Sequence, residues 1–291
     1  MTDITVIILT RDEDVHIKRA IASVKSFATR VLVVDSGSTD RTVPLARAAG
    51  AEVLCHPWTN HAVQFNWALD QIEGRDTWVL RLDADEIASS QLEDLIAEGL
   101  PDVAGLYLRR RIRFQGRLVR FGGVARLPTM RLFRNGSGRA EARWMDEHIS
   151  VEGRTAMLDA EIVDDNLRPL DWWTAKHNAY ASREVADLVL RHGGSARHGL
   201  KPWIRDHVYA RLPVGVRAGV YFLYRYILRG GCLDRGAARR FHVLQGFWYR
   251  YLVDAKLAEV RACIERTGVR PEVALQNVLG LRVPQSDRSG T

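Results

Sequence analysis

The chain has 291 residues, with a hydrophobic fraction of 46% and a charged fraction of 26%, a composition typical of folded globular proteins and not of disordered or fibrous ones. Its cysteines, Cys55, Cys232 and Cys263, are far apart and form no C-x-x-C motif, which argues against a disulfide framework or a cysteine zinc site and favours a reduced, intracellular compartment. The N-terminus lacks a basic region and no stretch reaches about 18 uncharged apolar residues, so neither a signal peptide nor a transmembrane helix is expected.

Charge is distributed unevenly along the chain. Residues 1–100 carry 16 Asp/Glu against 9 Lys/Arg, whereas the remaining residues carry 19 against 33. The acidic first part and the basic second part give a total of +7. This asymmetry predicts an anionic partner for the C-terminal half, such as nucleic acid, a phospholipid surface or a phosphorylated glycan.

The first part of the chain predicts alternating strands and helices. Apolar runs over residues 4–10, 31–34 and 51–55 are typical of buried strands, and helical spacing is found over residues 15–27 and 42–49. The pattern is βαβαβ with right-handed crossovers, as in doubly wound sheets. It lacks both the G-x-G-x-x-G and the G-x-x-x-x-G-K-[ST] motifs, which argues against a dinucleotide cofactor and P-loop chemistry.

A helix over residues 62–72 carries Gln64 and Asn66, and a strand over residues 78–86 follows it and ends in three acids. In open α/β sheets the carboxyl ends of strands form the ligand crevice, and acids at i and i+2 can point into one pocket. Clustered carboxylates favour a hard divalent cation. The alternative is that Asp85 or Glu86 caps the next helix, but residues 90–93 already supply a capping box for a helix over 92–98.

Beyond Pro101 the pattern changes to shorter strands. Residues 105–121 predict two strands that turn at Gln115 and Gly116, and residues 129–134 predict another, before a turn at 135–138. Arg111 and Arg113 form either a solvated face or a phosphate-binding one. Asp146 and Glu147, beside a histidine, form either a structural ion pair or the setting of a general base.

From Asp171 onward the sequence predicts helices, over residues 172–192, 203–212 and 214–229, and a disordered tail over 285–291. The helix over 214–229 has two faces. One carries arginines and the other is apolar: Arg217, Tyr221, Arg225 and Arg229 against Val216, Val220, Leu223 and Ile227. It either lies on an anionic membrane surface or packs on the core with a solvated arginine face.

The polar strand ends, taken in order, resemble those of the inverting family 2 glycosyltransferases with the GT-A fold. The motifs are residues 10–13 (TRDE), 34–40 (VDSGSTD), 64–66 (QFN) and 82–86 (LDADE). Residues 131–134 (RLFR), 145–148 (MDEH) and 176–180 (KHNAY) are similar to the bacterial branch that builds lipopolysaccharide core or other surface polysaccharide. By motif, the resemblance covers residues 4–184.

The resemblance implies roles for individual residues. Asp85 would be the metal ligand, with Mn²⁺ or Mg²⁺ gripping the donor diphosphate, and Glu147 would be the catalytic base. The nucleotide-sugar-binding residues would be Thr10, Arg11, Glu13, Asp35, Gln64, Asn66 and Asp83. Two positions depart from the family pattern: Asp12 stands where the family usually has Asn, and Asp146 where this branch often has His, so that either Asp146 or Glu147 is the candidate base.

The predicted architecture is an α/β fold of the GT-A type, with a Rossmann-like, mostly parallel central sheet, helices on both faces and a C-terminal helical region. Its expected divisions are a catalytic domain over residues 1–168, a basic helical and membrane-associated region over 169–284, and the tail. The predicted function is metal-dependent, inverting transfer from a nucleotide sugar, with UDP favoured, to a glycan or lipid-linked acceptor. The expected location is the cytoplasmic face of the inner membrane, with no nucleic acid as partner.

Two alternatives compete with this prediction. A sugar-1-phosphate nucleotidyltransferase shares the sheet type, but it is expected to carry a glycine- and lysine-rich loop after the first strand, where this chain has residues 10–13 (TRDE). A basic membrane- or nucleic-acid-binding protein would use its arginines on phosphates. The acidic N-terminal half offers no surface for a duplex.

Overall fold

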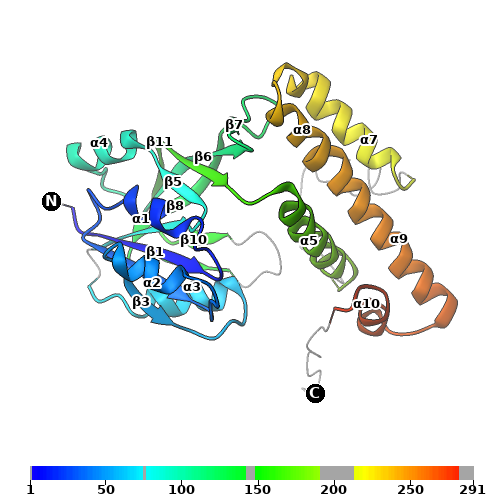
Figure 1. Cartoon of the computed structure of the whole chain (residues 1–291), viewed down its shortest axis with the longest axis horizontal. Coiled ribbons are helices and arrows are strands. Elements are labelled where there is room, and N and C mark those ends of the chain that lie inside the picture. Colours follow the sequence, from blue (N-terminus) through cyan, green and yellow to red (C-terminus); the bar gives the residue numbers. More distant parts are fainter. Residues whose placement is uncertain (1, 75–76, 142–147, 191–212, 282–291) are drawn as a thin grey trace. The chain divides into compact units, whose positions relative to one another are not determined.

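The computed structural model describes residues 2–74, 77–141, 148–190 and 213–281. The chain divides into two compact units. The first comprises Met1–Arg168 with Asp234–Ala238, and the second comprises Pro169–Leu233 with Arg239–Thr291. The first unit is built around a mixed β-sheet and the second is helical (Figure 1).

The first unit begins with a parallel α/β half, as predicted. Its strands β1 (Ile4–Thr10), β2 (Arg30–Asp35), β3 (Glu52–Cys55) and β4 (Trp78–Asp83) lie in the order β3-β2-β1-β4 and are parallel. The connecting helices are α1 (Ile17–Ala22), α2 (Thr42–Ala48) and α3 (His61–Leu69). Helix α1 is much shorter than the predicted 15–27, because residues 23–27 form turns after its end.

The described sheet continues through strands of both directions in the order β8-β6-β11-β5. Strand β8 (Leu127–Arg134) is antiparallel to both β4 and β6 (Gly105–Phe114), and β11 (Thr155–Asn166) is parallel to β6. The hairpin predicted at Gln115 and Gly116 is confirmed, since β7 (Arg117–Leu118) pairs with β6 across a turn at which both residues have positive φ. A separate hairpin joins β9 (Gly138–Ala140) to β10 (Ile149–Val151).

The strand predicted over residues 78–86 is wrong in its second half. Strand β4 ends at Asp83, Ala84 and Asp85 form a turn, and Glu86 opens β5 (Glu86–Ala88), which pairs with β11 in the antiparallel direction. Sequence patterning misses this break because Leu82 and Ala84 continue the alternation of buried residues through the turn. The three acids therefore do not share one strand end.

Alternate residues of β1 pack into two hydrophobic clusters, one on each face of the sheet. Ile4, Val6 and Ile8 pack with α1, α2 and α4 (Ser90–Glu98), whereas Ile7 packs with α3 and the β9–β10 hairpin. Helices thus cover both faces, as predicted. Burial of alternate side chains fixes the register of β1, because a slip of one residue would exchange the two faces.

The second unit consists of α5 (Leu170–Leu190), α7 (Val216–Leu223), α9 (Tyr249–Thr267) and α10 (Pro271–Leu279), joined in part by the short helices η2 (Tyr224–Leu228), η3 (Gly231–Leu233), α8 (Ala237–Val243) and η4 (Leu244–Trp248). Its core lies between α5, α9 and α10. Among the described residues, no helix is both long enough and apolar enough to cross a membrane. The helix predicted over 203–212 and the tail over 285–291 lie outside the described residues.

Candidate active site

The carboxyl ends of β1, β2 and β4 bring three of the predicted site residues to one edge of the sheet. In the parallel registers, Thr10 lies beside Asp35 and Leu9 lies beside Asp83. Strand β1 is central, so polar residues that end the strands on both its sides lie next to its own end. This edge is where ligands bind in open α/β sheets.

Asp35 is 2% exposed, and the turn that follows it fixes its carboxylate. Oδ2 accepts hydrogen bonds from the backbone N–H groups of Gly37 and Ser38, both at 2.9 Å, and Oδ1 accepts one from Thr10 Oγ1 at 3.2 Å. The turn needs Gly37, whose φ of +93° strains other residues. Thr10 and Asp35 therefore form a polar pair at this end of the sheet, with side chains that hydrogen bonds hold in place.

The loop after β1 is tied to the loop after β2 by hydrogen bonds. Asp12 N–H donates to Ser38 Oγ at 2.8 Å, Asp12 Oδ1 accepts from Thr39 N–H at 2.8 Å, and Glu13 N–H donates to Thr42 Oγ1 at 2.7 Å. Asp12 has a φ of +54°, in the left-handed region that Asn and Asp tolerate better than other non-glycine residues. An aspartate can therefore occupy the position at which the family usually has Asn. Arg11, beside it, is exposed.

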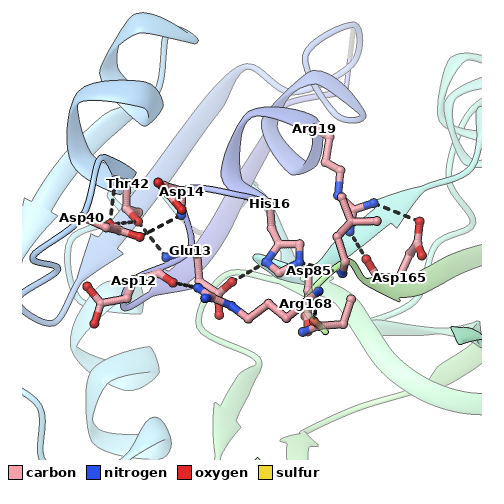
Figure 2. Close-up of polar contacts among 12 residues, drawn as sticks. Asp12, Glu13, Asp14, His16, Arg19, Asp40, Thr42, Asp85, Asp165 and Arg168 are labelled. Carbon is pink, nitrogen blue, oxygen red and sulfur yellow. Dashed lines mark hydrogen bonds and ion pairs between the residues drawn. The ribbon is translucent and has the colours of Figure 1, made fainter. Parts of the chain in front are cut away.

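The side chain of Glu13 points toward a buried histidine (Figure 2). Its Oε2 lies 2.5 Å from His16 Nδ1, and the opposite ring nitrogen, Nε2, accepts the N–H of Leu167 at 2.9 Å. Because Nε2 accepts a hydrogen bond, the ring proton lies on Nδ1 and is donated to Glu13. His16 was not among the predicted site residues, since its partner Leu167 is 151 positions away.

The acids at the end of β4 have different environments. Glu86 is 1% exposed, and its carboxylate accepts the Asp83 N–H at 3.0 Å and contacts Arg131 Nη2 at 2.5 Å. Burial raises the pKa of Glu86 to about 7, against the opposing pull of Arg131. Glu86 therefore braces the turn from inside the protein and does not cap the following helix.

Asp83 lies in a ring of arginines at the same edge. Its Oδ2 is 3.2 Å from Arg131 Nη2, and its Oδ1 is 3.6 Å from Arg81 Nε. Although the partial burial of Asp83 opposes its charge, Arg131, Arg81 and Arg110 hold its pKa far below the usual range. Asp83 is thus an ionised carboxylate, with a side chain that is 39% exposed.

Asp85 is held by the end of β11. Its Oδ2 accepts a hydrogen bond from Asn166 Nδ2 at 2.9 Å, and its backbone carbonyl accepts the Asp165 N–H at 2.9 Å. Within the described ranges, no cluster of three or more His, Cys, Asp or Glu side chains could hold a metal alone. A single carboxylate, that of Asp85, fits a cation such as Mg²⁺, which takes one or two carboxylates and completes its shell with substrate phosphate and water.

The last residues of β11 and the two residues that follow it join Asp85 to the β1 loop. Arg19 Nη1 contacts the Asp165 carboxylate at 2.9 Å, and Arg168 Nη2 donates to the carbonyl of Asp12 (Figure 2). Arg113 Nη1 lies 3.1 Å from the same carboxylate. Arg113, which the sequence places on a solvated or phosphate-binding face, is paired with Asp165. No motif of the sequence marks Arg19, Asp165 or Arg168, because their partners come from distant segments. The segment nevertheless holds both sides of the candidate site.

Gln64 and Asn66 contact backbone groups. Gln64 is 1% exposed and donates to the carbonyl of Val34 at 3.2 Å. Asn66 exchanges two hydrogen bonds with Ala140, at 2.9 and 3.0 Å, at the end of β9. Their predicted role in donor binding stays a prediction. The two candidate bases, Asp146 and Glu147, lie outside the described residues.

Comparison with known proteins identifies relatives of this chain. The family model "Glycosyl transferase family 2" matches residues 5–158. The lipopolysaccharide core biosynthesis glycosyltransferase LpsC of Rhizobium meliloti is 26% identical over 273 residues, which cover 90% of this chain and 94% of that protein. An uncharacterized glycosyltransferase of Rickettsia bellii is 43% identical over 93 residues, which cover 32% of this chain and 31% of that protein. The match therefore spans about a third of the length of the Rickettsia relatives.

Among solved structures, glucosyl-3-phosphoglycerate synthase from Mycobacterium tuberculosis, in complex with Mn²⁺, UDP and phosphoglyceric acid, is 17% identical to this chain. The alignment has a TM-score of 0.44 and covers 68% of this chain and 82% of that structure. This similarity is too low to support conclusions about ligands of the present protein.

Proposed function

The chain belongs to glycosyl transferase family 2, and on that premise we propose that it transfers a sugar from a nucleoside diphosphate sugar to a hydroxyl group of an acceptor, with inversion at the anomeric carbon. The family match confirms the resemblance and the GT-A fold class predicted from the strand-end motifs. Inversion follows from a single displacement, which requires a leaving group on one face of the sugar and a base on the other.

The proposal depends above all on the grouping of Thr10, Asp35 and Asp83 at the carboxyl ends of β1, β2 and β4. Thr10, Glu13 and Asp35 would receive the base of the donor nucleotide, and Asp83 would face its ribose or the metal. The ring of arginines around Asp83 keeps this carboxylate ionised at neutral pH. An ionised acid at this position can accept hydrogen bonds from ribose hydroxyls or contribute an oxygen ligand.

Asp85 would hold Mn²⁺ or Mg²⁺, with Asp83 either as a second ligand of the metal or as a partner of the ribose. Asn166 binds one oxygen of Asp85 and orients the carboxylate, which accepts no hydrogen bond at its other oxygen from the described residues. A bound divalent cation would neutralise the charge that develops on the departing nucleoside diphosphate. Neighbours that orient a carboxylate ligand are usual around metal sites, and Asn166 would have that role here.

In the sequence, the candidate bases Asp146 and Glu147 fall between β9 and β10, outside the described residues. The ends of this connection are fixed, because Glu141 N–H donates to the carbonyl of His148 at 2.9 Å and Asn66 binds Ala140. Asn66 would therefore act as a positioning residue for the segment of the chain that carries the base. One of the two carboxylates would take the proton of the acceptor hydroxyl as it attacks.

The donor and acceptor are proposed at the level of class. UDP is favoured because it is the usual donor nucleotide of the family that the motifs resemble. LpsC is named as an enzyme of lipopolysaccharide core biosynthesis, and its similarity extends over 90% of this chain, which supports an acceptor in cell-envelope glycan or lipid-linked form. The basic second half of the chain would serve such an acceptor at the cytoplasmic face of the inner membrane.

Calorimetric titration with UDP, GDP and CMP, each with and without Mn²⁺, tests the donor site. We expect metal-dependent binding of one nucleoside diphosphate, lost in Asp85→Asn. The matched control is Asp94→Asn, an exposed acid on α4, which should bind as the unaltered protein does. Absence of binding for every nucleotide, or equal binding by the Asp85→Asn variant, would refute the proposed site.

A further inference from the structure

Helix α7 and the π-helix η2 present an apolar face to solvent. Val216, Val220, Leu223 and Ile227 follow one another at intervals of four, three and four residues, so they lie along one side. Their exposed fractions are 48%, 48%, 56% and 55%, and Leu228 is 77% exposed. A surface helix ordinarily buries its apolar side against the core. This helix does the opposite.

Two of the three arginines of the predicted 214–229 helix, Arg217 and Arg225, point inward instead. Arg217 Nε donates to Asp254 Oδ2 at 3.1 Å, and Asp254 is buried on α9. Arg225 is 4% exposed and lies over the ring of Tyr221 at 5.6 Å. The predicted solvent-facing or lipid-facing orientation is wrong for Arg217 and Arg225, whereas Arg229 is exposed. The buried acid Asp254, 37 residues beyond Arg217, decides which side faces inward.

The continuous helical run formed by α8, η4 and α9 widens the apolar surface. Val243, Phe247 and Tyr251 are spaced by four residues and are all exposed. Phe247 contacts Phe222 of α7 with ring centroids 5.8 Å apart, and α7 lies side by side with α9 (Figure 1). We define the insertion face as Val216, Val220, Leu223, Ile227, Leu228, Val243, Phe247 and Tyr251. Exposed apolar surface that extends over two helices marks an interaction site.

The charges around the insertion face indicate its partner. Between residues 213 and 253 the only acid is Asp234, which is 4% exposed and accepts hydrogen bonds from the backbone N–H groups of Arg120 and Phe121. The exposed charged residues of this stretch that belong to the helical unit are all basic: Arg229, Arg239 and Arg240. A second copy of the chain would place like charges against one another. An anionic lipid surface complements both the apolar face and its positive rim.

We propose that the insertion face enters the interfacial region of an anionic lipid bilayer, with the exposed arginines at the level of the headgroups. Binding would then depend on apolar insertion and not on the inward arginines. This inference concerns membrane binding alone and does not require the proposed glycosyl transfer.

Co-sedimentation with phosphatidylglycerol/phosphatidylethanolamine vesicles, compared with phosphatidylcholine vesicles, tests the inference. The variant Val220→Gln/Leu223→Gln/Ile227→Gln should bind the anionic vesicles about tenfold or more weakly, because each substitution reduces the apolar area that the bilayer can bury. The matched control is Met157→Gln/Leu188→Gln, which alters two apolar residues of similar exposure elsewhere and should bind normally. High salt should weaken but not abolish binding of the unaltered chain.

A fluorescent probe then reports the depth of insertion. NBD attached to Leu228→Cys, in a chain with Cys55→Ser and Cys232→Ser, should shift its emission to the blue with anionic vesicles and be quenched by lipids brominated in their acyl chains. Unchanged vesicle binding by the triple variant would overturn the inference. So would a dimer of the unaltered chain in sedimentation velocity that the triple variant converts to monomer, with no vesicle binding by either.

Discussion

Glu86 allows a direct test of whether burial or ion pairing controls the acidic turn. Burial raises the pKa of Glu86 from 4.5 to about 7. The guanidinium of Arg131, whose Nη2 lies 2.5 Å from Glu86 Oε1, opposes this increase. The perturbation is Glu86→Gln, which keeps the shape of the side chain and removes its titration. If burial dominates, the native protein binds a proton at Glu86 over a pH range in which the unfolded chain does not.

The sign and size of the effect follow from linkage. Between pH 4.5 and about 7 the native state holds one more proton than the unfolded state, so the free energy of unfolding falls as the pH rises. At about 1.4 kcal/mol per unit of pKa, the loss is about 3 kcal/mol. The Glu86→Gln variant lacks this loss. The stability of the unaltered protein relative to the variant should therefore fall by that amount across the interval.

Urea unfolding of both proteins at several values of pH between 4.5 and 8, followed by tryptophan fluorescence, measures this difference. Glu98→Gln, an exposed acid on α4, serves as the control and should give a difference that does not change with pH. A stability of the unaltered protein relative to Glu86→Gln that stays constant or rises with pH would contradict this expectation. That result would mean that Arg131 keeps Glu86 ionised despite its burial.

Two further predictions concern the base and the helical unit. One of the two variants Glu147→Gln and Asp146→Asn should lower kcat by about 10²–10⁴-fold, while both should still bind nucleotide in calorimetry. Equally mild effects of both substitutions on kcat would contradict a carboxylate base at either position. The ring of His177 stacks on that of Trp173, with ring centroids 3.5 Å apart, and burial lowers the pKa of His177 from 6.5 to about 4. Between these values of pH the native protein therefore binds fewer protons at His177 than the unfolded chain does. Acidification from pH 6.5 to 4 should therefore remove up to about 3 kcal/mol of stability through this group. The free energy of unfolding of His177→Gln, measured by denaturation at each pH, should lack this loss, whereas the control His148→Gln should retain it. If the unaltered protein and both variants have the same dependence of stability on pH, burial of His177 does not lower its pKa as described.

Local patterns were sufficient to predict the parallel half of the fold. The apolar runs of β1, β2 and β4 define buried strands, and the carboxyl ends of parallel strands must meet at one edge. Thr10, Asp35 and Asp83 could therefore be placed together from sequence. Their motifs also identified the family, since the order of several short motifs is far more specific than any one of them.

Contacts between distant segments could not be predicted. The break after Asp83 depends on the pairing of β5 with β11, and the orientation of Asp85 depends on Asn166, 81 positions away. Helical periodicity separated the two faces of α7 correctly, but it could not say which face is inward. That choice depends on Asp254, an acid on another helix whose position no local pattern reveals.

The end of β11 connects the two parts that the reaction requires. Asn166 orients Asp85, and Leu167 and Arg168 bind His16 and the Asp12 carbonyl in the loop that would receive the nucleotide. A shift of this segment would therefore move the candidate metal ligand and the nucleotide loop together. In the proposed reaction, such coupling would keep the donor diphosphate and the base of the nucleotide in one fixed relation, which in-line displacement at the anomeric carbon requires. The segment thus contributes to geometry without contacting the reacting atoms.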